Sequence, residues 1–169
     1  GRIFAYDFQG NMLYAFGGHG YKAGLFMNPS AIEDLGDSLL VTDQKLGTIT
    51  QFTLTDYGKM INDGLAEYKK GNYDESANIW RKVLKHNGNY DQAYIGIGRA
   101  LLREKNYKEA MDYFELKLDA KNYSKAFKLY REVWFEENIG TILIIIAILI
   151  LLGFGVGFVK KARREVEKG

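Results

Sequence analysis

The sequence predicts a chain of mixed β and α structure in three successive parts, followed by a short charged tail. Apolar residues alternate with polar ones up to about residue 56, and recur with a period near 3.6 over residues 57–138. They are almost uninterrupted over residues 139–159. Alternation is typical of strands, and the longer period is typical of helices that pack on one face. An uncharged apolar stretch of about 20 residues is long enough to cross a membrane.

The composition excludes several kinds of site. Among the 169 residues there is no cysteine, which excludes a disulfide framework, a cysteine zinc site and a thiol nucleophile. Lysine plus arginine number 23 and aspartate plus glutamate 21, with the two signs interspersed, so no basic stripe predicts nucleic-acid binding. The first ten residues carry no basic leader and no apolar run. We therefore expect a fragment of a longer protein.

Five short strands are expected in the first part of the chain. Their predicted ranges are Ile3–Phe8, Met12–Phe16, Ala31–Leu35, Leu39–Thr42 and Thr48–Leu54. β-branched and aromatic residues between turns rich in Gly, Asn and Asp favour antiparallel sheets. Strands at this spacing suit a propeller blade or a sandwich.

A more specific pattern runs through the same residues. Its features, in chain order, are Phe16-Gly17-Gly18, Pro29 with Ala31-Ile32, Leu40-Val41-Thr42-Asp43 and Ile49-x-x-Phe52. Their types and order resemble the NHL repeat, a unit of six-bladed β-propellers. The resemblance implies a partial β-propeller over residues 1–56, with one complete blade and the end of another, and a sheet edge that further blades would pair.

Some propellers bind a metal or a sugar-like substrate in their central channel. The candidates for such a site are His19, Asp34 and Asp43, which lie on predicted loops or strand ends. One histidine and two turn carboxylates do not make a site, and we expect them to be turn and capping residues. The sequence predicts no catalytic residue, metal ligand or cofactor. A tethered propeller enzyme, of a metal-dependent lactonase or lyase type, is the alternative function.

The second part contains an internal repeat. The dipeptide Asn-Tyr occurs at residues 72–73, 89–90, 106–107 and 122–123, in steps of 17, 17 and 16 residues, so that the full period is 34. Gly64 and Gly98, Ser76 and Ala110, Tyr73 and Tyr107, and Trp80 and Phe114 follow the same period. This pattern resembles the tetratricopeptide repeat, a pair of antiparallel helices, although Lys105 stands where that repeat often has a turn glycine.

Helices are therefore expected at residues 58–70, 73–86, 90–104 and 107–118. Asn72, Asn89 and Asn106 precede three of them and are expected to cap them through their side chains. A fifth helix, starting at Tyr123, is expected to close the open end of the array.

The tetratricopeptide resemblance implies a partner site on the concave face, along the first helix of each pair. Its residues would be Tyr68, Lys69, Gln92, Arg99 and Arg103. The three cations favour an acidic segment or a carboxylate terminus of a partner protein. The alternative is a solvated face that contacts the strands of the same chain.

The third part, Thr141–Val159, holds no charged residue and predicts a transmembrane helix. Five basic residues follow it: Lys160, Lys161, Arg163, Arg164 and Lys168. Basic residues favour the cytoplasmic side, so the tail, residues 160–169, is expected in the cytoplasm and the N-terminal part outside. Gly153 and Gly157 form a G-x-x-x-G motif at which a second membrane helix could approach closely.

The order of these parts resembles that of bacterial membrane proteins with an NHL propeller, tetratricopeptide helices and a membrane span. In that group, links to Yip1-like proteins and sugar ABC transporters imply an accessory or sensing role beside a transporter. The sequence thus predicts a membrane-anchored, extracytoplasmic module that binds protein or peptide partners and carries out no chemistry of its own.

Overall fold

The first part of the chain folds into five strands, as predicted. The computed structural model describes residues 1–36 and 38–166, with only the backbone for residues 158 and 161–166. The strands are β1 (Arg2–Tyr6), β2 (Met12–Gly17), β3 (Pro29–Leu35), β4 (Ser38–Asp43) and β5 (Thr48–Thr53). Each overlaps its predicted range, because alternation and turn residues were both clear in this region.

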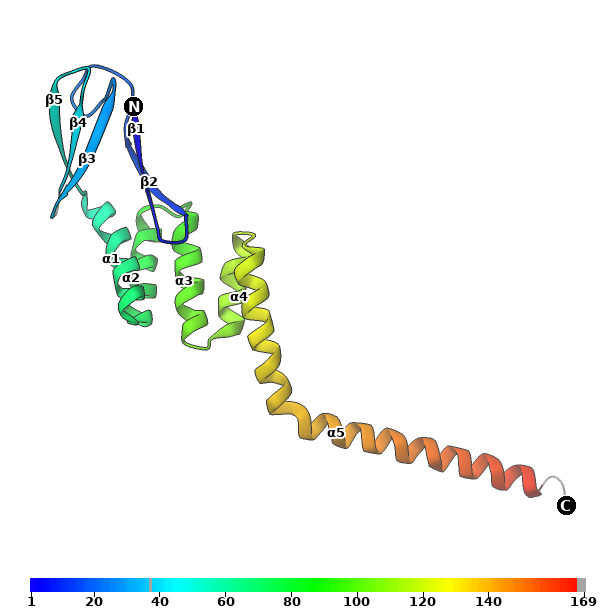
Figure 1. Ribbon diagram of the computed structural model, residues 1–169. Coiled ribbons are helices and arrows are strands. Elements are labelled where there is room, and N and C mark those ends of the chain that lie inside the picture. Colours follow the sequence, from blue (N-terminus) through cyan, green and yellow to red (C-terminus); the bar gives the residue numbers. More distant parts are fainter. Residues whose placement is uncertain (37, 167–169) are drawn as a thin grey trace. The chain divides into compact units, whose positions relative to one another are not determined.

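These strands form two separate antiparallel sheets. β1 pairs with β2, and β3, β4 and β5 pair in chain order (Figure 1). A blade of a propeller has four strands. The sheet of β3, β4 and β5, which corresponds to the blade that we expected to be complete, has three strands in the described part of the chain. The chain turns into a helix where a fourth strand would follow. The Thr55 hydroxyl caps the start of this helix by accepting a hydrogen bond from the Gly58 N–H at 3.2 Å. The propeller itself stays a prediction.

Aromatic rings join the two sheets. The Phe16 ring of β2 lies 4.8 Å from the Phe52 ring of β5, measured between centroids, and Phe26 lies 5.5 Å from Phe52. Phe26 is completely buried, and such tilted ring pairs add stability beyond the area they bury.

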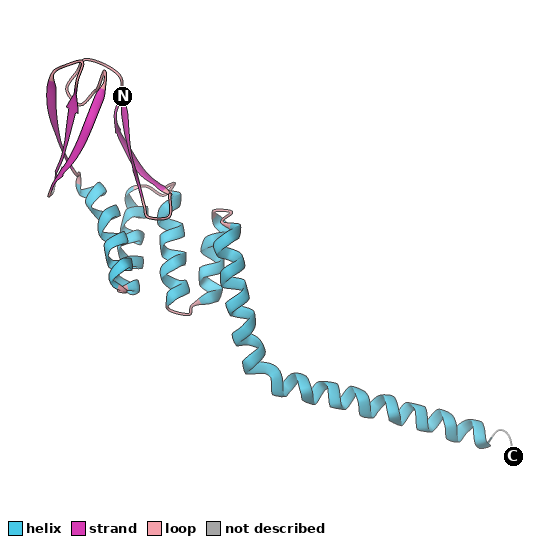
Figure 2. Cartoon of the chain, viewed as in Figure 1, coloured by secondary structure: helices cyan, strands magenta, loops and turns pink. Residues whose placement is uncertain are grey.

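The helices of the second part match their predicted ranges closely. They are α1 (Asp56–Lys70), α2 (Tyr73–His86), α3 (Asp91–Arg103) and α4 (Tyr107–Leu116). α1 packs against α2, α2 against α3 and α3 against α4, which gives the antiparallel row seen in Figure 2. The tetratricopeptide-like helical pairs are therefore present.

The repeat landmarks form the core of these pairs. A Cβ atom added to Gly64 would lie 2.9 Å from the Trp80 ring, and one added to Gly98 would lie 2.7 Å from the Phe114 ring. Positions 34 residues apart thus make the same contact, a bulky ring against a bare backbone. The Ser76 hydroxyl, which is buried, donates to the Gly64 carbonyl at 2.7 Å.

The prediction that asparagines cap the helices through their side chains was wrong. Asn72 and Asn106 stand at N-cap positions without a side-chain capping bond, and the N-cap of α3 is Tyr90 rather than Asn89. The Asn72 amide instead donates to Glu67 at 2.6 Å, back across the turn between α1 and α2. The side chain therefore stabilises the preceding helix end rather than the following one.

The last helix, α5 (Ala120–Val166), starts earlier than expected and has no break at the predicted membrane boundary. Its segment Ala120–Gly157 is the one helical segment among the described residues that is long and apolar enough to cross a membrane, and its most apolar window is not buried. Gly1–Ala126 and Phe127–Gly169 are two compact units. Lys168, part of the predicted cytoplasmic tail, lies outside the described residues.

Candidate interaction site on the helical repeats

The structure brings together three of the five residues predicted on the concave face. The Arg99 guanidinium of α3 lies over the Tyr68 ring of α1, with its carbon 4.9 Å from the ring centroid. The Arg103 Nε donates to the Tyr68 hydroxyl at 3.2 Å. This contact raises the pKa of Arg103, which therefore stays charged. Tyr68 is thus a platform that orients two arginines from the neighbouring helix.

The other two predicted residues lie beside this platform. Gln92 lines the same small hollow, of about 10 Å³, as Tyr68 and Arg99. That volume holds at most about one water molecule. Lys69 is exposed at the edge of the site. The five residues therefore form one surface, on which the side chains of Tyr68, Gln92 and Arg99 are half-buried and the two cations Lys69 and Arg103 are exposed.

The turn between β1 and β2 also lies on this surface, which the sequence did not predict. The Asp7 carboxylate lies 3.5 Å from the Arg99 Nη1, and both side chains are largely buried. The Lys69 ammonium lies 4.9 Å from the centre of the Phe8 ring. The alternative prediction for this face was a contact with the strands of the same chain. The turn between β1 and β2 forms such a contact, through Asp7 and Phe8.

Asp7 is held in place mainly by its own turn. Its Oδ1 accepts the backbone N–H groups of Gln9 at 2.8 Å and Asn11 at 2.9 Å, and its Oδ2 accepts the Asn11 amide at 2.8 Å. Burial raises the pKa of Asp7, but these hydrogen bonds and the Arg99 charge outweigh it and leave the pKa below its ordinary value. Asp7 is therefore a carboxylate at neutral pH.

Two tyrosines hold the base of the same hairpin. The Tyr90 hydroxyl donates to the Leu13 carbonyl at 2.8 Å, and the Tyr14 hydroxyl lies 3.4 Å from the Asn62 side-chain oxygen. Burial raises the pKa of Tyr90, so its hydroxyl keeps the proton that it donates. No sequence signal pointed to these contacts, because Leu13 and Tyr90 are 77 residues apart and the Asn-Tyr repeat that contains Tyr90 does not include Leu13.

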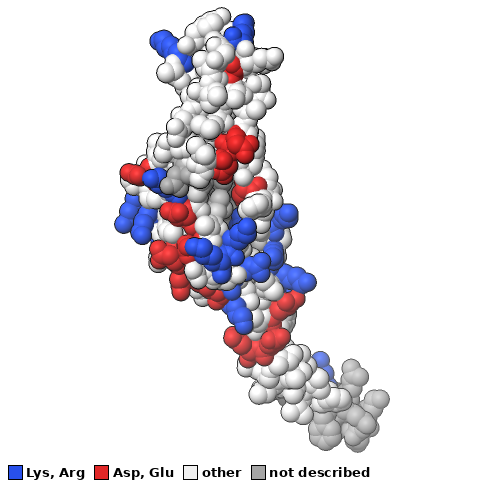
Figure 3. Space-filling model, turned by 60° about the vertical axis from the view of Figure 1, so that its left-hand side comes forward, with Lys and Arg blue, Asp and Glu red and all other residues white. Residues whose placement is uncertain are grey.

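The charges around the site are mixed. Figure 3 shows Lys, Arg, Asp and Glu side chains interspersed over the helical part of the first unit and sparse over the strands. One example is Lys117, whose ammonium lies 2.7 Å from the Asp91 carboxylate and 4.3 Å from the Tyr94 ring centre. The cations of the site therefore act locally and are not part of one large positive field over this face.

The carboxylate and histidine candidates of the strand region do not form a cluster. Asp43 is buried, and it accepts four backbone N–H groups, from Met27, Asn28, Lys45 and Leu46, at 2.7–3.0 Å. Burial raises the pKa of Asp43, but these donors together lower it below the ordinary value. Asp34 is exposed on β3, and His19 pairs in an isolated bridge with Phe26. No group of three His, Asp or Glu side chains that could hold a metal occurs within the described ranges.

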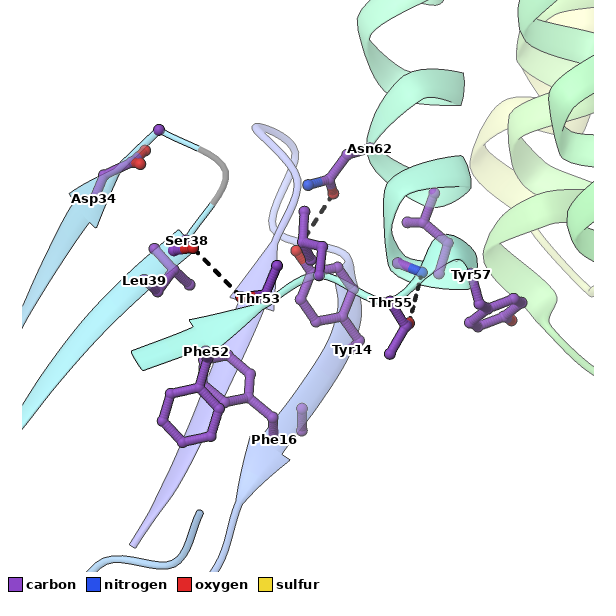
Figure 4. Close-up of a pocket in the computed structure, with 15 residues that line it drawn as sticks. Tyr14, Phe16, Asp34, Ser38, Leu39, Phe52, Thr53, Thr55, Tyr57 and Asn62 are labelled. Carbon is purple, nitrogen blue, oxygen red and sulfur yellow. Dashed lines mark hydrogen bonds between the residues drawn. The ribbon is translucent and has the colours of Figure 1, made fainter. Parts of the chain in front are cut away.

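A cavity of about 380 Å³ lies between β2, β5 and the start of α1 (Figure 4). Its walls combine aromatic rings, among them Tyr14, Phe16 and Phe52, with the hydroxyl groups of Ser38 and Thr53. Those two hydroxyls lie 3.4 Å apart and bond to each other, so they are already partnered. The volume is at the lower end of the range for small-molecule sites, roughly 300–1,000 Å³.

The two predicted membrane-contact glycines lie on α5. A Cβ atom added to Gly153 or Gly157 would meet no described atom within 4 Å. Their surface is therefore exposed in the described structure.

The comparison with protein families agrees with the repeat period. Residues 62–127 match the tetratricopeptide repeat model, over less than half of the chain. No curated protein and no solved structure gives a significant match. The similarity therefore covers the helical pairs and the first turns of α5, and it extends neither to the strands nor to the apolar stretch.

Proposed function

We propose that this chain is a membrane-anchored interaction module whose helical repeats bind an acidic segment of a partner protein. Repeats of the tetratricopeptide type generally mediate protein–protein interactions, and residues 62–127 match that family. The observation that carries the proposal is the arrangement of Arg99 and Arg103 around the Tyr68 ring. Two oriented guanidinium groups can bind carboxylates with paired hydrogen bonds, as flexible lysines cannot.

The anchor in this proposal is the apolar part of α5. Its length and composition support a membrane span, and the basic residues that begin at Lys160 support a cytoplasmic tail. The repeats and the strands would then lie outside the cytoplasm. An NHL-like propeller formed with further blades, and a role beside a transporter, are extensions of this proposal that rest on the sequence resemblance alone.

The binding step can be tested with the full chain in lipid nanodiscs. The probes are a fluorescent peptide of alternating glutamate and serine and its counterpart with glutamine. We expect the glutamate peptide to bind more tightly, and Arg103→Gln to weaken it about two- to fivefold, the range of an exposed ion pair. Lys82→Gln, which removes the same charge from the exposed surface of α2, is the matched control. Equal losses in both variants would overturn the assignment of the site.

The orientation can be tested separately because the chain has no cysteine. A single cysteine at the exposed position Lys82, or at Lys160, can be labelled on intact cells with a maleimide that does not cross membranes. We expect label at residue 82 and none at residue 160 until the cells are opened. Label at residue 160 alone would place the repeats in the cytoplasm.

A further inference from the structure

We infer that the turn Asp7–Asn11 is a built-in occupant of the partner site at Arg99: it binds where a partner segment would bind, and its side chains show which partner chemistry the site prefers. An external partner presents a carboxylate followed directly by an aromatic side chain and displaces the turn. This inference rests on the proposed function and specifies its partner. Asp7 and Phe8 are adjacent in sequence, and they meet two different cations of the repeats, Arg99 and Lys69.

The contact between the turn and the site is loose enough to be replaced. The Asp7–Arg99 distance of 3.5 Å is long for a charge-assisted hydrogen bond, which is typically about 2.7–2.9 Å. It joins one oxygen to one nitrogen, whereas a carboxylate free to approach can form two parallel bonds with a guanidinium. The Phe8 side chain is 96% exposed, so Lys69 covers little of its ring. A partner with freer geometry can bind better than the turn.

When the turn leaves the site, the turn itself and the repeat surface around Arg99 both keep their other contacts and stay ordered. The Asp7 carboxylate keeps its hydrogen bonds to Gln9 and Asn11 when Arg99 is removed from it. Arg99 keeps its place over the Tyr68 ring. Leu13 and Tyr14 hold the base of the hairpin through Tyr90 and Asn62, so only the turn has to move. Because the site is preorganised, an incoming carboxylate orders few groups on binding.

The experiment compares binding of two fluorescent peptides to the full chain in nanodiscs. One peptide has the sequence of residues 6–12, and its counterpart has asparagine in place of the aspartate. In the Asp7→Asn variant the turn loses its charge, and we expect the acidic peptide to bind about tenfold more tightly than to the wild type, as the competent fraction rises. Asp112→Asn, which removes the same charge from the exposed surface of α4, is the control and should bind as the wild type does.

A second variant keeps the inference testable if Asp7→Asn unfolds. Phe8→Ala removes an exposed ring, so folding should not depend on it, and we expect about twofold tighter binding of the acidic peptide. Adding Arg99→Gln to either variant should abolish the gain.

The outcomes separate this inference from the proposed function. Equal affinity of the wild type, Asp7→Asn and Phe8→Ala for the acidic peptide would overturn the built-in occupant and leave acidic recognition standing. Absence of binding to every variant would overturn the acidic partner itself. Equal binding of both peptides would overturn the requirement for a carboxylate.

Discussion

The helical pairs and the strands of this chain bury their apolar residues to very different degrees. In the helices, the large side chains Ile61, Trp80, Val83, Ile97 and Phe114 are almost completely buried. In the strands and their turns, Leu13, Phe26 and Val41 are buried, whereas large apolar residues with exposures between 47% and 96% include Phe4, Tyr6, Phe8, Ile32, Leu35 and Ile49.

The difference follows from how each kind of structure finds its partners. Every helix of the repeat packs on the helix next to it in sequence, so the 34-residue pattern contains its own core. A sheet needs a second layer on its face, which adjacent strands do not provide. The described strands therefore keep apolar faces open, and their stability should depend less on any single side chain.

The largest expected difference in the free energy of unfolding is between two Phe→Ala substitutions, one in the helical pairs and one in the strand region. Phe114→Ala removes a completely buried ring from the contact of α4 with α3 and should lower the free energy of unfolding by about 3–5 kcal/mol. Phe8→Ala removes an exposed ring and should change it by no more than about 0.5 kcal/mol. Urea unfolding of the full chain in detergent, followed by circular dichroism, measures both. Similar losses would refute the contrast between the regions.

A smaller effect is expected from adding one methyl group to the helical core. In Gly96→Ala the new Cβ would lie 2.5 Å from the Trp80 indole nitrogen, so the ring must move, at a cost of about 1–3 kcal/mol. Gly88→Ala is the control, because its nearest contact would be at 3.8 Å. Thermal unfolding of the two variants gives the comparison. An unchanged midpoint for Gly96→Ala would mean that the core packs less tightly than its geometry indicates.

What the sequence predicted well was local or periodic. The 34-residue period located all four repeat helices. Gly64, Trp80, Gly98 and Phe114 follow that period, and the structure shows that they pack in two equivalent pairs, because helix contacts repeat with the sequence. The five residues of the concave face were predicted from the resemblance to the tetratricopeptide repeat rather than from the period alone. What it missed was the turn that covers this surface: Asp7 and Arg99 are 92 residues apart, and an aspartate in a turn has an ordinary local explanation. A long-range contact without a periodic signal requires the structure.

The contact of Asp7 in the strand region with Arg99 in the helical pairs gives a pH-dependent prediction. Asp7→Asn should lower the free energy of unfolding by about 1–2 kcal/mol at pH 7, since it removes a charge-assisted contact with Arg99. The folded-state pKa of Asp7 is lowered, so its contribution is fully present above its unfolded value, about pH 4, and is lost as the pH falls through the folded value. Arg99 and Tyr90 are the groups whose charge or proton interacts with Asp7, and the raised pKa of Tyr90 keeps its hydroxyl neutral over this range.

The measurement is unfolding of the wild type and of Asp7→Asn between pH 7 and pH 2. The two stability curves should converge below about pH 4. Asn11→Ala keeps the Asp7 charge and should still lose stability as the acid protonates it. A constant difference between wild type and Asp7→Asn across this range would show that the loss is steric rather than electrostatic.

The smallest expected effect compares the two repeats with each other. Gly71 and Lys105 occupy the same position of the repeat, and both are left-handed, with φ of 92° and 66°. Glycine adopts this conformation without strain, whereas a lysine side chain crowds its own backbone. Lys105→Gly should therefore raise the free energy of unfolding by about 0.5–1 kcal/mol, and Gly71→Lys should lower it by a similar amount. Thermal unfolding of the two variants measures the two changes. If both variants were stabilised, or both destabilised, backbone strain at this position would not determine the stability of the turn.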